Sequence, residues 1–302
     1  MIGGPISATR GGAQTMQGAA LQGRSLWDDA RRRLFRNRAA VASMILLALL
    51  VLAAVVGPYL TPFTYDQINK TDTWARPLTG GHLLGADPLG RDLLARLLIG
   101  LRVSLAVGVV ATGVSLVIGV LWGSVSGYLG GQVDELMMRI VEVLYSLPYI
   151  FFVILLMVVF GRNFILMFVA IGAVEWLTMA RIVRGQTLSL KQREFVEAAR
   201  AAGLRGSAIV GRHIVPNLIG PVVVYVTLTI PGVILAESFL SFLGMGVQEP
   251  LTSLGTLISE GAVDMDLAPW MLVFPALTMV VTLLCFNFIG DGLRDAFDPK
   301  DR

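Results

Sequence analysis

The sequence has 302 residues, of which 55% are apolar and only 15% are Asp, Glu, Lys or Arg. A soluble domain carries about a quarter charged residues, so this composition excludes a soluble enzyme, a disordered chain and a secreted disulfide scaffold. The apolar excess fits a polytopic membrane protein, because a run of about 20 apolar residues crosses a bilayer core about 30 Å thick. The net charge of +3 is small, and the positions of the charges are more informative than their sum.

Two segments precede the first apolar run and together form a predicted cytoplasmic N-terminal region, 1–38. Residues 1–22 are rich in Gly, Ala and Gln, which predicts a disordered tail. Residues 23–38 are a basic amphipathic segment in which arginines crowd against Trp, Leu and Phe. A secretory signal peptide is the alternative. The long lead-in, the spanning length of the next run and the lack of a convincing small-residue cleavage site argue against it.

Six apolar runs are long enough to be transmembrane (TM) helices. TM1 to TM6 are predicted at 39–60, 103–129, 136–160, 164–183, 217–242 and 269–289. The larger connections and the C-terminus are an outer loop at 61–102, a cytoplasmic loop at 184–216, an outer loop at 243–268 and a cytoplasmic end at 290–302. With both termini in the cytoplasm, 18 of the 24 Lys and Arg residues lie inside and 6 outside. The positive-inside rule selects this orientation, so we expect an all-α protein with six spans.

Several local features bear on these spans. Pro148 removes a helical hydrogen bond from TM3 and predicts a kink. Pro221 and Pro231 each adjoin a glycine in TM5, which predicts irregular backbone satisfied by protein or by a water-filled cavity. In the outer loop, leucines at helical spacing predict an interfacial helix over 91–102. The many Gly and Ser residues of TM2 indicate either close helix packing or the lining of a pathway.

The longest cytoplasmic loop contains the sequence EFVEAARAAG, from Glu194 to Gly203. Its first part favours a helix in which Glu197 pairs with Arg193 and Arg200. Gly203 is expected to end this helix in a left-handed conformation. A second short helix is expected over 206–213. From the residues alone, this loop is either a solvated connection or a docking element for another protein.

This loop resembles a known pattern. EAARAAG, a basic stretch and then Ile-Val-Pro ending at Pro216 resemble the EAA loop of ATP-binding-cassette (ABC) importer permeases. His213 and Val215 depart from the usual apolar residue and leucine. The resemblance implies the type I ABC importer permease fold and a coupling helix that binds a cytoplasmic ATPase. The residues that it assigns to this coupling are Glu194, Glu197, Ala198, Ala199, Arg200, Gly203 and Pro216.

Other segments narrow the resemblance. LGADPLGRD at 84–92 is similar to permeases of the peptide and nickel importer group, and ESFLSFLGMGVQ at 237–248 and GDGLRDAFDPK at 290–300 are similar to its C-type subunit. Within that subunit type, the segments at 23–33 and 176–190 look most like oligopeptide permeases. The implied function is a membrane-spanning subunit for oligopeptide import in the bacterial inner (plasma) membrane. Permeases for dipeptides, nickel or glutathione are the alternatives within the group.

The resemblance also implies partners. They are a second homologous permease, two ATPase subunits that bind ATP and Mg, an extracytoplasmic peptide-binding protein, the peptide and membrane lipid, without nucleic acid. The sequence has no Walker-type phosphate loop, so we expect no cofactor on this chain and no ATPase activity of its own. His82 is predicted outside and His213 inside, so the two cannot share a metal ion. No histidine lies within a span, which argues against an intramembrane protease, and the docking loop argues against a passive channel.

Four acids lie in or near the predicted spans, where charged groups are costly and often functional. Glu142 is expected to pair with Arg139, and Asp291 to cap the inner end of TM6. Glu175 is a candidate for the translocation cavity, where it would bind a peptide amino group. Glu237 fits either helix-to-helix bonding or a gate. With Pro148, Glu175 and Glu237 are the candidate pathway or gate residues.

Overall fold

The computed structural model describes residues 26–160 and 164–297, so the predicted tail at 1–22 lies outside it. Within the described residues the chain is helical, with two isolated β-bridges in the loop before α3. The elements are α1 (Leu26–Arg36), α2 (Arg38–Val56), the 3-10 turn η1 (Gly57–Tyr59), α3 (Leu93–Leu129), α4 (Gly131–Ser146), α5 (Tyr149–Phe160), α6 (Phe164–Lys191), α7 (Glu194–Ala201), α8 (Gly206–Ile209), the π-helix η2 (Val210–Ile214), α9 (Val215–Phe242), α10 (Leu254–Val263) and α11 (Trp270–Phe297).

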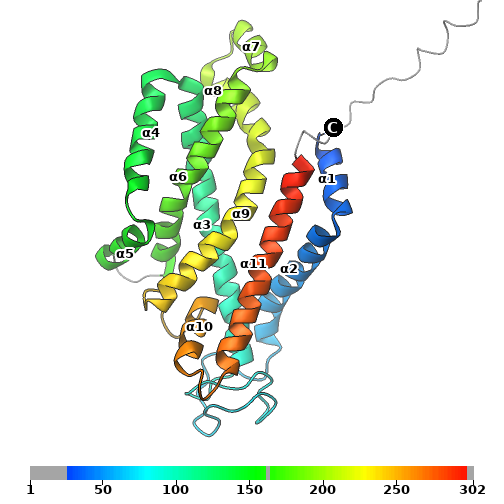
Figure 1. Ribbon diagram of the computed structural model, residues 1–302, viewed down its shortest axis with the longest axis vertical. Helices are drawn as coiled ribbons and strands as arrows, with labels where there is room; N and C mark the ends of the chain where they lie inside the picture. Colours follow the sequence, from blue (N-terminus) through cyan, green and yellow to red (C-terminus); the bar gives the residue numbers. More distant parts are fainter. Residues whose placement is uncertain (1–25, 161–163, 298–302) are drawn as a thin grey trace, which may run out of the picture.

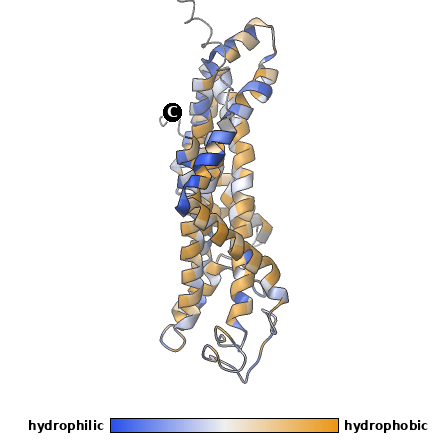
Figure 2. Cartoon of the chain, turned by 90° about the vertical axis from the view of Figure 1, so that its right-hand side faces the viewer, coloured by the Kyte–Doolittle hydropathy of each residue, from blue (hydrophilic) through white to orange (hydrophobic). Residues whose placement is uncertain are grey.

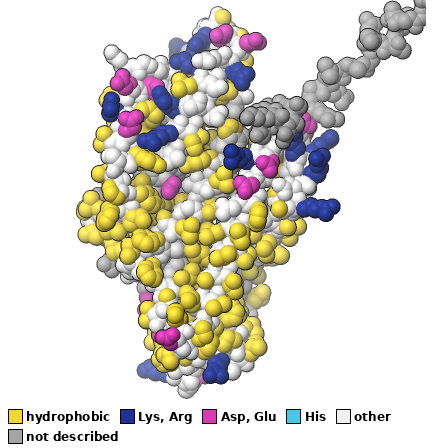
Figure 3. Space-filling view, viewed as in Figure 1, with side chains coloured by type: hydrophobic (Ala, Val, Ile, Leu, Met, Phe, Trp, Pro, Cys, Tyr) yellow, Lys and Arg dark blue, Asp and Glu magenta, His cyan; other side chains and the backbone are white. Residues whose placement is uncertain are grey.

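Long helices run side by side along the length of the molecule, which therefore has two distinct ends (Figure 1). One end carries α7 and α8, and α1 and the last turns of α11 lie toward it; the other end carries α10 and the loop before α3. Apolar residues dominate the middle of the helices (Figure 2). On the molecular surface, Lys, Arg, Asp and Glu gather mainly toward the two ends (Figure 3). We call these the α7 end, predicted to be cytoplasmic, and the α10 end, predicted to be outside.

The described helices support fewer spans than the sequence predicts. Four helices are long and apolar enough to cross a membrane: α2 with η1, α3, α8 to α9, and α11. The bent pair α4 and α5 brings the number to at most five. Helix α6, which contains the predicted TM4, is not among them. Six spans therefore stays a prediction.

α3 is one helix of 37 residues, so the interfacial helix expected over 91–102 is not a separate element. Asp92 starts α3, because its carboxylate accepts a hydrogen bond of 2.8 Å from the backbone N–H of Ala95. Three of the five leucines of this segment pack into a cluster with α9, α10 and α11 instead of facing a membrane surface. They are Leu93, Leu97 and Leu101. Their spacing identifies the apolar face of a helix, but it does not say what covers that face.

The glycines of α3 serve close packing against α6. Gly119 and Gly123 touch α6 at Met179 and Ala180 without space for a Cβ atom. A Cβ atom on Gly127 would lie 2.9 Å from the carbonyl oxygen of Arg184. The small residues of the predicted TM2 therefore allow these two helices to approach closely, as the packing interpretation expects.

Prolines affect the helices differently. The predicted TM3, 136–160, is two helices, α4 and α5, which meet at 85°. Leu147 has extended backbone, with φ −76° and ψ 135°, because proline disfavours the helical conformation in the residue before it. Pro148 thus causes a full break where a kink was expected. Pro221 and Pro231, in contrast, lie within α9, which continues past both.

The connection predicted to be cytoplasmic, 184–216, is shorter than expected. Helix α6 continues to Lys191, beyond the expected end of TM4 at 183. The helix expected over 206–213 is not separate, because α8, η2 and α9 form one helix, Gly206–Phe242. Only residues 192–205 of this connection therefore lie outside the two long helices. Helix α7 makes up most of these residues.

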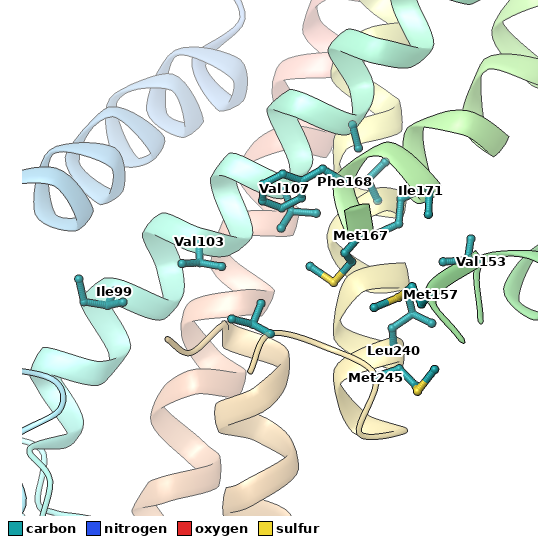
Figure 4. Close-up of a cluster of buried hydrophobic side chains, with 14 residues drawn as sticks. Ile99, Val103, Val107, Val153, Met157, Met167, Phe168, Ile171, Leu240 and Met245 are labelled. Atoms are coloured by element: carbon teal, nitrogen blue, oxygen red, sulfur yellow. The ribbon is translucent and has the colours of Figure 1, made fainter. Parts of the chain in front are cut away.

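The largest buried cluster joins α3, α5, α6 and α9. Figure 4 shows Val107 of α3 next to Phe168 of α6, with Val153 and Met157 of α5 on the far side of α6 from α3. Leu240 of α9 belongs to the same cluster. This packing holds α5 against α6 and α9.

Candidate functional site

Helix α7 lies at the tip of the α7 end, beside α8 (Figure 1). One of its faces is buried, because Val196 is 0% exposed and Ala199 is 7% exposed. The other face is open to solvent. Its exposed residues are Glu194, Phe195, Glu197, Ala198 and Arg200. The helix therefore presents acidic and apolar groups to the outside while it stays attached to the bundle.

The buried face of α7 is part of a cluster that reaches both neighbouring long helices. Val196 and Ala199 pack in this cluster with residues of α6, α8, η2 and α9. Those residues are Met179, Val183, Ile209, Ile214, Leu218 and Val222. A displacement of α7 must therefore displace the ends of α6 and α9, because a close-packed core transmits strain.

Gly203 ends α7 in the predicted left-handed conformation, with φ +77°. The N–H of Gly203 donates to the carbonyl oxygen of Arg200 at 2.9 Å, and the N–H of Leu204 donates to that of Ala199 at 3.2 Å. These two bonds form a Schellman motif, which satisfies the last carbonyl groups of a helix and turns the chain away. The prediction for the backbone of Gly203 is confirmed.

Tyr128, in the last turn of α3, supports this tip. The guanidinium carbon of Arg200 lies 5.4 Å from the centre of its ring, and the Lys191 ammonium lies 5.8 Å from it. Both distances are in the range of cation–π attraction. A Cβ atom on Gly206 would lie 2.9 Å from the ring, so the start of α8 contacts it closely. Sequence reasoning missed Tyr128, which is distant in the chain.

The ion pairs expected within the coupling helix are absent from the described residues. Their salt bridges include neither Glu197 nor Arg193, and Arg200 contacts the tyrosine ring instead. Glu197 is exposed and can therefore pair with a cation on another protein. Pro216 lies in the first turn of α9, directly after the π-helix, and its ring is exposed.

Two of the candidate pathway residues come together at the junction of α4 and α5. Glu175 of α6 and Pro148 line a cavity of about 390 Å³. The other lining residues are Leu144, Tyr145, Ser146, Leu147, Tyr149, Val174, Leu177 and Thr178. The hydroxyl group of Tyr149 is buried and has no hydrogen-bond partner among the described residues. The carboxylate of Glu175 in this cavity can accept a hydrogen bond from an ammonium or N–H donor.

Glu237 lies apart from this cavity, in the half of α9 near the α10 end. Its side chain is 0% exposed. It accepts hydrogen bonds from the hydroxyl groups of Ser241, at 2.7 Å, and Ser104 of α3, at 3.2 Å. The Ser104 oxygen also accepts the N–H of Leu254, the first residue of α10, at 3.1 Å. Of the two alternatives for Glu237, the geometry is that of helix-to-helix hydrogen bonding.

The two remaining acids near the predicted spans are Glu142 and Asp291. Glu142 lies 3.8 Å from Arg139, as expected, and both side chains are mostly exposed. Asp291 is exposed within α11, which continues past it to Phe297, and its place at the inner membrane interface stays a prediction.

A buried network of charges at the α10 end was missed. Arg96 is 2% exposed, and its guanidinium donates at 2.7 Å to both Asp87 and Glu260. Arg91 donates to Asp87 at 2.6 Å and to Glu249 at 2.8 Å. Burial disfavours the charge on Arg91, but the hydrogen bonds to Glu249 and Asp87 outweigh it and raise the pKa of this guanidinium. The signal in the sequence was the dense charge of LGADPLGRD in an otherwise apolar chain.

A second ion pair was missed at the α7 end. Arg184 of α6 donates two hydrogen bonds of 2.6 Å to Asp134 of α4, and the hydroxyl of Ser126 of α3 also donates to this carboxylate. These contacts join α3, α4 and α6 at the α7 end. They strengthen the part of the bundle on which α7 rests.

Comparison with known proteins identifies the family. The family described as "Binding-protein-dependent transport system inner membrane component" matches residues 96–302, and "N-terminal TM domain of oligopeptide transport permease C" matches 25–77. The "Oligopeptide transport system permease protein OppC" of Escherichia coli K12 is 60% identical over 93% of this chain and 94% of that protein. The protein of the same name from Haemophilus influenzae is 55% identical over 96% and 94%. The "Dipeptide transport system permease protein DppC" of Bacillus subtilis is 44% identical over 92% and 87%.

A solved structure shows the same fold. It is the inward-facing MetNI methionine ABC transporter, whose matching chain has a TM-score of 0.54 and 20% identity, over 68% of this chain and 96% of that one. By these matches, the chain belongs to the family of binding-protein-dependent transport system inner membrane components and has the fold of a type I ABC importer permease.

Proposed function

We propose that this chain is the membrane-spanning permease subunit of an ATP-driven oligopeptide importer in a bacterial inner membrane. Family membership makes it a multi-pass component of an ABC transporter. The relatives of 55% and 60% identity are both named for oligopeptide transport and are matched over almost their whole length, which supports oligopeptides as the substrate. The dipeptide permease relative of 44% identity favours dipeptides as the second candidate.

In this proposal the chain forms the pathway together with a second homologous permease. Two ATPase subunits bind ATP and Mg at the α7 end, and a peptide-binding protein delivers the peptide at the α10 end. This chain hydrolyses no ATP and binds no cofactor itself. Its part of the mechanism is to convert movement of the ATPases into movement of helices, as in rigid-body alternating access.

The exposed but firmly attached α7 carries this proposal. Its open face offers Glu194, Glu197 and the bare backbone around Ala198 to an ATPase. Its buried face packs on the cytoplasmic ends of α6 and α9 through the cluster of Val196 and Ala199. When the ATPases close on ATP, α7 moves with them and tilts α6 and α9. Because α6 also carries Glu175, that tilt changes the cavity at the α4–α5 break.

The cavity beside Glu175 is the proposed contact of the pathway with the peptide. Glu175 receives the amino terminus, a group that every unmodified peptide has whatever its side chains. The other lining groups are mostly apolar and offer few specific hydrogen bonds to the side chains of the peptide. An importer for many peptides needs this combination, because side-chain variety prevents tight recognition within the pathway.

The coupling role is tested with Gly203→Val. Valine at φ +77° is strained by about 1–2 kcal/mol, which shifts the population of the native turn by about 5- to 30-fold. We expect normal amounts of the protein in the membrane, weaker co-purification of the ATPases and a matching fall in peptide uptake. Gly185→Val is the control, because Gly185 lies exposed in α6 with nothing near its Cβ position. Full ATPase binding and full uptake by well-expressed Gly203→Val protein would refute the coupling role.

The peptide contact is tested with Glu175→Gln, which removes the charge and keeps the shape. Uptake of a peptide with a free amino terminus should fall about tenfold, the cost of one charge-assisted hydrogen bond. Uptake of the same peptide acetylated at its amino terminus should be unchanged. Glu142→Gln, an exposed acid on α4, is the matched control. An equal loss for both peptides would contradict the role of Glu175 while leaving the coupling role of α7 intact.

A further inference from the structure

A polar cavity lies between α1 and the last turns of α11, toward the predicted cytoplasmic end (Figure 1). Its volume is about 540 Å³. Two guanidinium groups, one amide and one carboxylate give it a mixed but net positive lining. The lining residues are Arg33, Arg36, Asn37, Gly292, Asp295 and Ala296. Neither the coupling helix nor the Glu175 cavity uses this site.

An apolar groove lies between α2 and α11. Its volume is about 560 Å³. Every lining residue is apolar: Met44, Leu47, Ala48, Val51, Leu52, Val55 and Ile289. Several of these side chains are open to the surroundings, with Leu52 57% and Val55 51% exposed. In water such a surface would be costly, so this groove has an apolar occupant.

The polar cavity and the apolar groove are parts of one seam. On α11, Ile289 of the groove and Gly292 and Ala296 of the cavity follow the spacing i, i+3, i+7, which places them on one face. On the other side, Asn37 caps α2, and Met44 begins the groove about 10 Å further along that helix. The cavity thus lies next to the end of the groove that is nearer the α7 end.

We propose that this seam binds one phospholipid of the cytoplasmic leaflet. The phosphate group lies in the polar cavity, where the guanidinium group of Arg36 binds phosphate through paired N–H donors. The acyl chains fill the groove between α2 and α11. Asp295 accepts a hydrogen bond from an amine or hydroxyl group of the head group. A basic amphipathic helix at the membrane surface, such as α1, is suited to hold a head group at this depth.

The amphipathic order of the seam identifies the occupant. A charged, hydrogen-bonding cavity lies one turn of α11 from a groove without a polar side chain, and a phospholipid has the same order of groups. A transmembrane helix of another subunit would fill the groove but bring no phosphate or similar anion to Arg36. This inference is independent of the proposed peptide substrate, because no residue of the seam belongs to the transport contacts.

The test uses the complete transporter, purified in mild detergent, with native mass spectrometry to count the phospholipids that remain bound. Arg36→Gln removes a cation of the cavity, and Ala48→Phe fills the groove. The controls are Arg31→Gln, on the opposite side of α1, and Ala42→Phe, about 120° round α2 from Ala48. After delipidation, phosphatidylglycerol is added back, in parallel with a diacylglycerol of the same acyl chains and with inorganic phosphate.

We expect one retained phospholipid per copy in the wild-type protein and in both controls. Arg36→Gln and Ala48→Phe should each bind added phosphatidylglycerol about tenfold more weakly, and neither diacylglycerol nor inorganic phosphate should occupy the seam. Equal retention in all variants, or equal loss in the controls, would overturn the proposal in favour of a non-specific lipid layer. It would also be overturned if Ala48→Phe releases the second permease while the phospholipid stays, because the groove would then be a protein interface.

Discussion

Replacing Arg96 by methionine should destabilise the α10 end of the bundle. The guanidinium of Arg96 is 2% exposed and lies between the carboxylates of Asp87, 0% exposed, and Glu260, 30% exposed. Methionine keeps the apolar stem but removes the charge. Asp87 then remains buried with one cationic partner, Arg91 at 2.6 Å, and with the backbone N–H of Leu89 at 2.9 Å.

The expected magnitude follows from this geometry. Breaking a buried ion pair by removing one partner costs about 3–5 kcal/mol, because the remaining charge stays buried. Asp87 keeps Arg91 and its backbone donors, so we expect about 3 kcal/mol, the lower end of that range. Glu260 adds less, because its side chain is 30% exposed and water can replace the lost partner.

The assay is a double-mutant cycle on the purified protein, with unfolding followed in detergent by denaturant titration. Arg96→Met, Glu260→Gln and the double variant should give a coupling energy of about 1 kcal/mol or more. Arg76→Met, at an exposed position of the loop before α3, is the control and should change the free energy of unfolding by less than about 0.5 kcal/mol. The reasoning is refuted if Arg96→Met is as mild as this control.

Two further substitutions test the packing of the bundle. Gly123→Val should cost about 1–3 kcal/mol, because its side chain would collide with the backbone of Ala180 on α6, whereas Gly113→Val, with nothing near its Cβ position, should leave the thermal midpoint almost unchanged. Glu237→Ala should cost about 1–3 kcal/mol, because it leaves the buried hydroxyl of Ser104 without its acceptor; Glu237→Gln keeps an acceptor oxygen and should be milder by the same measurement. Equal midpoints within either pair would contradict these assignments.

Much of the helical fold was predictable because local rules act on neighbouring residues. The chain turns in a left-handed conformation where α7 ends, and glycine adopts the positive φ of this turn without steric strain. The conformation of Gly203 was therefore predictable. The break at Pro148 follows from the missing N–H and from the restriction on Leu147, although its angle of 85° was not predictable. The prediction of a separate interfacial helix over 91–102 was wrong, because leucines that pack on protein have the same spacing as leucines that face a membrane.

The candidate site was predictable where it depends on one stretch of chain. The EAARAAG motif identified α7, but its expected internal ion pairs do not form among the described residues, since Arg200 contacts Tyr128, a partner far away in the sequence. The cavity that brings Glu175 and Pro148 together depends on the direction of α5. That direction is set by packing against α6 and α9, which no local pattern encodes.

By itself, the sequence determined that the chain is an apolar, helical, polytopic protein with a basic N-terminal segment and a glycine-terminated helix in the connection that it predicts to be the longest cytoplasmic one. These properties follow from composition, hydrophobic periodicity and backbone preferences, all of which act within a few residues. The tertiary structure alone decided that Arg96 bridges Asp87 and Glu260 and that Glu237 bonds Ser104. The physical reason is that a buried charge or polar group must find a partner wherever the packing of distant helices places one.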